Sequence, residues 1–183
     1  MIIGIPIRSF ETAKQRLAGH LTPEERRTVA ELLAGHALVT AAALTDVVIV
    51  TGDAGVRRWA EERSVEAIDD DGTLDGAATA VAIRAGAAPW GILHADLPTL
   101  THHDLEAALV GFAGRGTAIA PSWDGGTSLI MSSGRFAFSY GPGSFHRHLA
   151  HRPESAIIIR PGLALDVDEP EHLASMVRGR LGG

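Results

Sequence analysis

Three aspartates follow strand-like apolar runs at distant points of the chain. Asp96 follows "GILHA", and Asp166 and Asp168 stand one residue apart in "GLALDVDEPEHL". Side chains at positions i and i+2 of a strand share a face, so the carboxylates of Asp166 and Asp168 would repel each other there unless positive charge lies nearby. Mg²⁺ binds oxygen ligands and commonly uses carboxylates together with substrate phosphates. These three aspartates therefore predict a magnesium site formed by Asp96, Asp166 and Asp168.

A purely structural interpretation of the same residues stays open. Asp168 precedes "EPEHL" and could cap a final helix, because aspartate is a favoured residue at a helix N-cap. Asp166 could instead pair with an arginine. Either arrangement would account for the acidic pair without a metal ion.

Basic residues follow the first apolar run, in "PIRSFETAKQRL". Arg8, Lys14 and Arg16 lie between a predicted strand and a predicted helix, where α/β sheets commonly bind anions. Arginine offers a planar fork of donors and lysine a point charge, a combination suited to a polyphosphate. The glycine spacing of a P-loop is absent. The alternative is a basic loop that is simply exposed to solvent.

Two glycine-rich stretches, "DGGTSLI" and "YGPGSFHRHL", suggest a second binding region. Glycine allows the backbone to approach a ligand closely, and Ser144 could cap a helix whose N-terminus attracts anions. Thr127, Gly141 and Ser144 could together hold a small phosphorylated acid. The alternative is a pair of tight turns, which is the commonest use of such glycines.

Neither group of clustered histidines predicts a metal site. The histidines of "HRHLAH" (146–151) have no glutamate base at the required spacing and are expected to be surface residues on a helix. His102 and His103 fit the first turn of another helix.

Short apolar runs alternate with helical patterns. The runs predict strands at 2–7, 47–50, 91–95, 117–121, 128–131, 156–160 and 163–167. Thr22 with Glu25, and Thr101 with Asp104, have the three-residue spacing of N-terminal caps. Further helices are expected after residue 53, over 76–87 and from about residue 170.

This alternation predicts an α/β fold with a mostly parallel sheet covered on both faces. After about residue 120, closer strands separated by glycine-rich turns predict an antiparallel or mixed section. We expect a single domain over residues 1–183, with ligands at the carboxyl ends of the strands.

Composition excludes several classes of function. The 183 residues carry a formal net charge of −6, which does not favour binding to nucleic acid. The absence of cysteine excludes disulfides, thiolate nucleophiles and cysteine-ligated zinc. No leader peptide is evident, and no apolar run approaches the ~20 residues of a membrane span, so we expect a cytoplasmic protein.

Taken together, the motifs resemble a known family. "PIRSFETAKQRLAGHLTPEER", "VVIVTGD", "ADLPTLTHHDLEAAL", "APSWDGGTSLI", "YGPGSFHRHLA" and "GLALDVDEPEHL" are similar, in this order and over nearly the whole chain, to the CofC/FbiD family. Its members are the guanylyltransferases of coenzyme F-420 biosynthesis that act on 2-phospho-L-lactate or phosphoenolpyruvate. The resemblance implies a Rossmann-like three-layer sandwich of the MobA-like nucleotidyltransferase type, related to the nucleotide-diphospho-sugar transferases.

The resemblance also implies roles for the residues already singled out. It implies Mg²⁺ at Asp96, Asp166 and Asp168, with GTP and a small phosphorylated carboxylic acid as partners. The site residues expected on this basis are, for catalysis, Lys14, Arg16 and Asp96; for the nucleotide, Arg8, Lys14, Arg16 and Asp75; and for the acceptor, Thr127, Gly141 and Ser144. A homodimer is compatible with the sequence.

Three positions depart from the family pattern. Arg8 stands where lysine is usual, "GGTS" replaces "GGTN", and Asp75 in "TLDGAATA" stands where asparagine is typical. An amide can donate hydrogen bonds and an ionised carboxylate cannot, so Asp75 is expected to alter ribose or base recognition. The competing hypotheses are another MobA-like nucleotidyltransferase and a non-catalytic GTP-binding relative.

Overall fold

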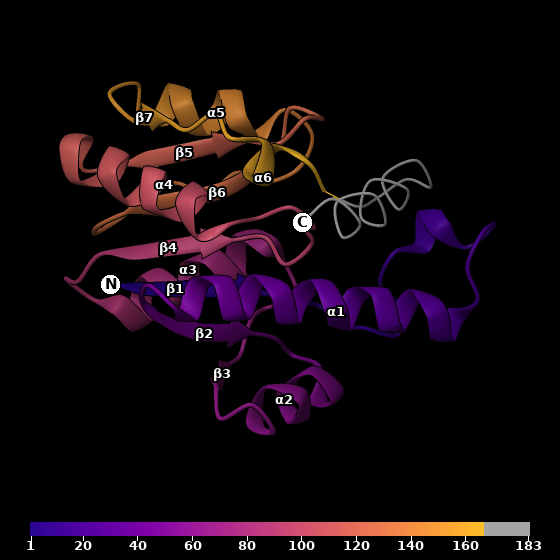
Figure 1. The fold of residues 1–183 in the computed structure, drawn as a ribbon. Coiled ribbons are helices and arrows are strands. Elements are labelled where there is room, and N and C mark those ends of the chain that lie inside the picture. Colours follow the sequence, from indigo (N-terminus) through magenta and orange to yellow (C-terminus); the bar gives the residue numbers. More distant parts are fainter. Residues whose placement is uncertain (167–183) are drawn as a thin grey trace.

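The computed structural model describes residues 1–166, and within them seven strands form one sheet (Figure 1). The strand order is β3-β2-β1-β4-β6-β5-β7. The strands are β1 (Ile2–Pro6), β2 (Asp46–Val50), β3 (Glu66–Ile68), β4 (Trp90–Leu93), β5 (Ala118–Pro121), β6 (Thr127–Ser132) and β7 (Ala156–Ile157). All neighbouring pairs are parallel except those of β6, which is antiparallel to both β4 and β5. The mixed section predicted after residue 120 is thus confirmed.

Helices connect the strands and cover both faces of the sheet. They are η1 (Gln15–Leu17), α1 (Pro23–Ala42), α2 (Ala54–Glu61), α3 (Leu74–Ala85), α4 (His102–Arg115), α5 (Ser144–His151) and α6 (Pro161–Ala164). Two predicted capping boxes are confirmed. The Thr22 hydroxyl accepts from the Glu25 amide and the Glu25 carboxylate from the Thr22 amide, and Thr101 and Asp104 make the same exchange before α4.

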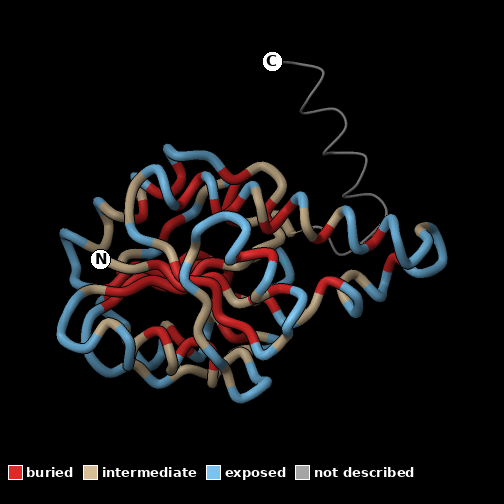
Figure 2. The backbone as a smooth tube through the Cα atoms, turned by 90° about the horizontal axis from the view of Figure 1, so that it is seen from below, coloured by how far each residue is buried: buried red, intermediate tan, exposed pale blue. Residues whose placement is uncertain are grey.

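Alternation along the strands divides the apolar side chains between two cores. Ile3 and Ile5 of β1 face the core shared with α1, α2 and α4, whereas Val48 and Val50 of β2 face the core shared with α3. Such alternation is the period-2 geometry of a strand covered on both sides. Buried residues accordingly concentrate along the sheet, between exposed outer helix surfaces (Figure 2). The predicted three-layer α/β sandwich is confirmed.

The packing of α3 on the sheet depends on one glycine. A Cβ atom at Gly4 of β1 would lie 2.2 Å from a methyl carbon of Val81 on α3. Real Cβ atoms do not approach other carbons so closely, so only glycine permits this separation of helix and strand.

The structure corrects two predicted strands near the end of the described chain. The strand expected at 156–160 is limited to Ala156–Ile157. The first two residues of the strand expected at 163–167 belong instead to the helix α6. Pro161 at the first helical position favours α6, and Gly162 allows the helix to pack against Asp104, whose carboxylate a Cβ would meet at 2.1 Å. The final helix expected from residue 170 lies outside the described residues. No helix within residues 1–166 has the length and apolar character needed to cross a membrane.

Candidate active site

Strand polarity brings distant segments to one edge of the sheet. Because β6 runs antiparallel to β4, the carboxyl end of β4 lies beside the amino end of β6, and the His94 amide donates to the Ser128 carbonyl at 2.9 Å. Residues 94–96 and Thr127 therefore share an edge with the carboxyl end of β1. This is the edge at which open α/β sheets bind ligands.

The basic loop after β1 is held in place by an aromatic anchor. Phe10 is buried and meets the Trp59 ring of α2 edge to face at 5.4 Å. Further along the loop, Lys14 adopts a left-handed backbone conformation, with φ 54° and ψ 39°. A non-glycine residue in that region is strained, and such residues are often found at functional sites.

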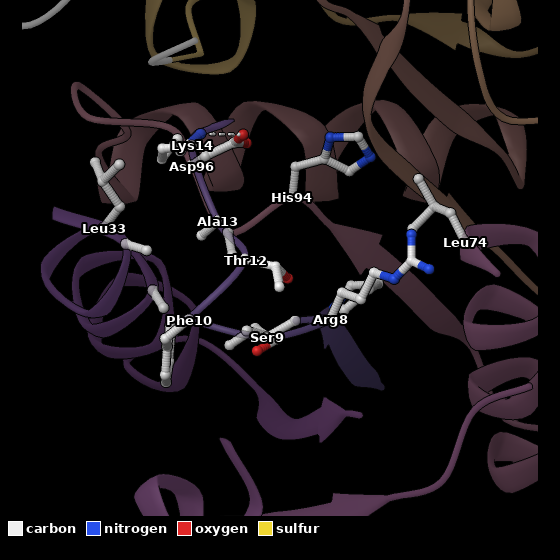
Figure 3. Close-up of a pocket in the computed structure, with 15 residues that line it drawn as sticks. Arg8, Ser9, Phe10, Thr12, Ala13, Lys14, Leu33, Leu74, His94 and Asp96 are labelled. Carbon is white, nitrogen blue, oxygen red and sulfur yellow. Dashed lines mark hydrogen bonds and ion pairs between the residues drawn. The ribbon is translucent and has the colours of Figure 1, made fainter. Parts of the chain in front are cut away.

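A cavity of about 310 Å³ lies between this loop and the end of β4. Figure 3 shows Lys14 and Asp96 at one end, Arg8 and Leu74 at the other, and His94 on the wall between them. The cavity is therefore large enough for part of a substrate and carries charged side chains at both ends.

Lys14 and Asp96 form an ion pair in this cavity. The Lys14 Nζ atom lies 2.8 Å from Asp96 Oδ2, and the two side chains are 7% and 28% exposed. Burial raises the pKa of Asp96, but the Lys14 ammonium and His94 act in the opposite direction, and the net pKa lies below its usual value. The carboxylate is therefore ionised at neutral pH and holds the ammonium in position.

The other oxygen of Asp96 suits a cation. Asp96 Oδ1 is buried and accepts no hydrogen bond. An ionised, unpartnered carboxylate oxygen is the kind of donor that Mg²⁺ binds. Within residues 1–166, however, no three histidine or carboxylate side chains are grouped closely enough to hold a metal ion. Asp166 is half-buried two residues after α6, and Asp168 lies outside the described residues, so the three-aspartate site stays a prediction.

The two arginines of the basic loop occupy different positions. Arg8 is an exposed residue and lines the cavity beside Leu74 (Figure 3). Arg16 is an exposed residue of η1 and is not among the residues that line the cavity. The structure thus brings Arg8, Lys14 and Asp96 together around one space.

The residues predicted for the acceptor form a buried, hydrogen-bonded cluster. Thr127 and Ser144 are each 1% exposed, and their hydroxyl oxygens lie 3.1 Å apart. Thr127 Oγ1 also lies 3.0 Å from Nδ1 of His148, and the Ser144 amide donates to the Gly141 carbonyl. Ser144 is the first residue of α5 and Gly143 is its cap, so the expected capping by Ser144 is wrong.

His148 completes this cluster and is fully buried, contrary to the surface position expected for it. Its Nε2 atom accepts from the Ser139 amide at 2.9 Å, so the neutral ring carries its proton on Nδ1 and donates to Thr127. Burial, opposed by the Asp75 carboxylate and reinforced by the neighbouring Arg147 charge, lowers the pKa of His148 to about 4. The ring is therefore neutral at pH 7. His148 lies four residues after Ser144 and so shares its helix face, and that spacing was the available signal.

Asp75 lies in the first turn of α3 and contacts the backbone of the predicted acceptor region. Its Oδ1 atom accepts from the Tyr140 amide at 2.7 Å. This contact joins the residue expected to bind the nucleotide to the segment that carries Gly141. Gly141 has a φ of +105°, which explains the need for glycine there.

His94 is a site residue that the sequence analysis did not single out. It lines the cavity, its Nε2 atom is buried without a hydrogen-bond partner, and its ring lies 5.7 Å from that of Tyr140. It precedes Asp96 by two residues at the end of β4, and that spacing was the available signal.

A family model described as "Guanylyl transferase CofC like" matches residues 1–179. The chain belongs to this family. A phosphoenolpyruvate guanylyltransferase from Sphaerobacter thermophilus is 33% identical over 94% of this chain and 90% of its own. A 2-phospho-L-lactate guanylyltransferase from Methanopyrus kandleri is 29% identical over 92% of this chain and 87% of its own. The resemblance read from the sequence is confirmed, and membership supports guanylyl transfer as the enzymatic activity.

Solved structures support the fold independently. A proposed nucleotide-diphospho-sugar transferase from Desulfovibrio desulfuricans G20 superimposes with a TM-score of 0.77 at 18% identity, covering 100% of this chain and 88% of its own. At that identity the likeness concerns the fold. It agrees with the nucleotide-diphospho-sugar transferase type expected for the CofC-like family.

Proposed function

We propose that the protein transfers GMP from GTP to phosphoenolpyruvate, giving enolpyruvyl-diphospho-5'-guanosine and pyrophosphate in a Mg²⁺-dependent reaction. The observation that carries this proposal is the Lys14–Asp96 pair at the ligand-binding edge of the sheet, in a chain of the CofC-like family. The pair supplies a cation for phosphate and a carboxylate oxygen for a metal ion within one cavity.

The reaction requires little acid–base catalysis. An oxygen of the acceptor phosphate, already anionic, attacks the α-phosphorus of GTP; the bond to the bridging oxygen breaks, and pyrophosphate leaves with that electron pair. Rate acceleration then depends on alignment of the two phosphates and on neutralisation of their negative charge.

Lys14 and Arg8 supply positive charge on opposite sides of the cavity. We propose that Lys14 contacts the phosphates at the reacting end and that Arg8 contacts the remaining nucleotide, with Arg16 approaching the triphosphate from η1. When bound, Mg²⁺ held by Asp96, Asp166 and Asp168 would reduce the charge on the attacked phosphate and on pyrophosphate. Asp96 can serve both partners, because Oδ2 accepts from the Lys14 ammonium and Oδ1 has no hydrogen-bond partner.

The acceptor is proposed to bind at Thr127, Gly141 and Ser144. Thr127 and Ser144 lie together at the amino ends of β6 and α5, next to the edge that carries Asp96. Phosphoenolpyruvate is favoured over 2-phospho-L-lactate because the similar bacterial relatives, such as that from Conexibacter woesei (34% identical), carry the phosphoenolpyruvate name. We further propose one catalytic domain in a cytoplasmic protein, with the oligomeric state to be measured by light scattering.

A substrate matrix tests the proposal. Purified protein is mixed with GTP or ATP and with phosphoenolpyruvate or 2-phospho-L-lactate, with Mg²⁺ or with EDTA, and pyrophosphate release is followed. We expect release with GTP, phosphoenolpyruvate and Mg²⁺, and its loss with EDTA. Absence of release from every combination would contradict the proposed activity, and release with EDTA would contradict the metal requirement.

Calorimetry with GTP and a wider set of acceptors extend the experiment to the two competing functions. Tight GTP binding by calorimetry without pyrophosphate release would indicate a non-catalytic GTP-binding relative. Release only with a sugar phosphate or molybdopterin acceptor would indicate another MobA-like nucleotidyltransferase. The ion pair and the open cavity favour catalysis, since binding alone does not require a buried, unpartnered carboxylate oxygen.

A further inference from the structure

The segment 139–143, here called the acceptor loop, is held by one side chain of the helix that follows it. Nε of Arg147 donates to the Ser139 hydroxyl at 2.8 Å, and Nη1 donates to the Pro142 carbonyl at 2.6 Å. Nη2 donates to the Ser139 carbonyl at 2.9 Å and to the Tyr140 carbonyl at 3.2 Å. All three guanidinium nitrogens are therefore directed at the loop.

These contacts depend on the shape of the guanidinium group. Its donors lie in a plane and diverge, so that one group can reach several carbonyl oxygens arranged around it. A lysine ammonium is a compact donor at the end of a flexible stem and cannot span Ser139 and Pro142 together. The charge on Arg147 also strengthens each of these hydrogen bonds relative to a neutral donor.

Other side chains hold the amide groups of the same loop. The Ser139 amide donates to His148 and the Tyr140 amide donates to Asp75. With its carbonyls directed at Arg147, the loop can form the positive-φ turn at Gly141 and Gly143, where φ is +105° and +69°. This turn leads directly into Ser144 at the start of α5.

We infer that Arg147 is a positioning residue that sets the geometry of the acceptor loop and thereby the affinity for the phosphorylated acid, without contacting the substrate. This inference rests on the proposed function, because it takes Gly141 and Ser144 as acceptor contacts. Arg147 is exposed, and within residues 1–166 the hydrogen bonds of its side chain all go to the loop.

The experiment compares Arg147→Ala and Arg147→Lys with Arg135→Ala. Arg135 is an exposed arginine between β6 and the acceptor loop, so its replacement removes the same charge while the loop contacts remain. We expect KM for the acceptor to rise by about tenfold or more in both Arg147 variants, while KM for GTP changes less than about twofold. Arg135→Ala should behave as wild type, and methylguanidinium should restore acceptor affinity to Arg147→Ala.

A second readout does not depend on activity. Hydrogen exchange at the Ser139, Tyr140 and Ser144 amides should accelerate in Arg147→Ala but not in Arg135→Ala, because these amides are ordered by the loop contacts. Equal effects on the two KM values, full recovery by lysine, or unchanged exchange would each overturn the inference. If the wild-type protein releases no pyrophosphate, the proposed function has failed, and the exchange measurement alone decides whether Arg147 orders the loop.

Discussion

The two ends of the candidate site differ in charge, in burial and in how completely their polar atoms are hydrogen-bonded. At the proposed nucleotide end, Lys14 and Asp96 are charged, line an open cavity and leave one carboxylate oxygen without a partner. At the proposed acceptor end, Thr127, Ser144 and His148 are neutral, almost fully buried and hydrogen-bonded to one another. The charged end therefore has groups that can bind a ligand directly, whereas the hydrogen bonds of the neutral end fix the positions of its side chains.

This difference has an energetic basis. A buried charge must be compensated, so the strength of the Lys14–Asp96 pair depends on keeping both members. A buried neutral cluster is stable when each donor has an acceptor, and it becomes costly when one group is lost. Substitutions at the charged end should therefore lower activity more than stability, whereas substitutions at the neutral end should lower stability and raise KM for the acceptor.

The largest effect is expected at the charged end. Lys14→Met should lower kcat/KM by about 10³-fold, because a preorganised cation no longer faces the developing charge. It should also lower the free energy of unfolding by about 2 kcal/mol, since the Asp96 carboxylate is left without its partner. Pyrophosphate release and urea denaturation measure the two effects.

The double variant Lys14→Met/Asp96→Asn is the matched control for that substitution. It removes both charges, so it should recover most of the stability and none of the activity. Recovery of activity in the double variant would mean that Lys14 serves only to neutralise Asp96.

The next effect is expected at the neutral end. Thr127→Val removes the hydroxyl that accepts from His148 and contacts Ser144, and should destabilise the protein by about 1–3 kcal/mol while raising KM for the acceptor. Thr117→Val is the control, because Thr117 makes a similar buried bond to Ser132, at 3.0 Å. Thr117→Val should lower stability by a similar amount and leave KM for the acceptor unchanged. If KM for the acceptor rose equally in Thr117→Val, the effect of Thr127→Val on KM would reflect a general loss of stability.

A smaller effect is expected on the pH dependence of stability. The pKa of His148 falls from 6.5 to about 4 on folding, chiefly through burial, so the unfolded state binds a proton more readily. Stability from this residue is present above pH 6.5 and is lost as the pH falls toward 4, by an amount on the order of 3 kcal/mol. The Tm of thermal unfolding should therefore fall less steeply between pH 7 and pH 4 for His148→Gln than for wild type. Parallel plots of Tm against pH for the two proteins would contradict the neutral, buried ring.

The smallest effect is expected for Asp75→Asn. The amide oxygen of asparagine can accept from the Tyr140 amide as the carboxylate does, so the acceptor loop should remain in place. We expect acceptor KM within about threefold of wild type, measured with GTP and with ATP. Asp75→Leu removes the acceptor and should weaken binding of the phosphorylated acid. A shift in the preference between GTP and ATP in Asp75→Asn would instead place Asp75 at the nucleotide.

Sequence patterns were sufficient where local chemistry determines structure. The capping residues at Thr22 and Thr101, the alternation of strands and helices, and the position of Asp96 after a strand were all predictable. Lys14 could be named from its place after β1. Its left-handed backbone and its pairing with Asp96 could not, since both depend on how the loop returns to the sheet.

The remaining features depend on contacts between distant segments. His148 reads as one of several histidines on a short helix, and only the packing of α5 against β5 distinguishes it from exposed His146 and His151. Asp75 reads as a departure from the family pattern, and its bond to Tyr140 spans 65 residues. The misassigned strand at 163–167 reflects an apolar run short enough to suit either a strand or a helix.

The close seat of α3 on Gly4 has a consequence for how this enzyme could be inactivated. A methyl group at that position would collide with Val81 and push α3 away from the sheet. Because Asp75 lies in the first turn of α3, this shift would weaken its hydrogen bond with the Tyr140 amide. A substitution in the middle of a central strand, at a residue that does not line the cavity, would then raise KM for the acceptor in kinetic assays.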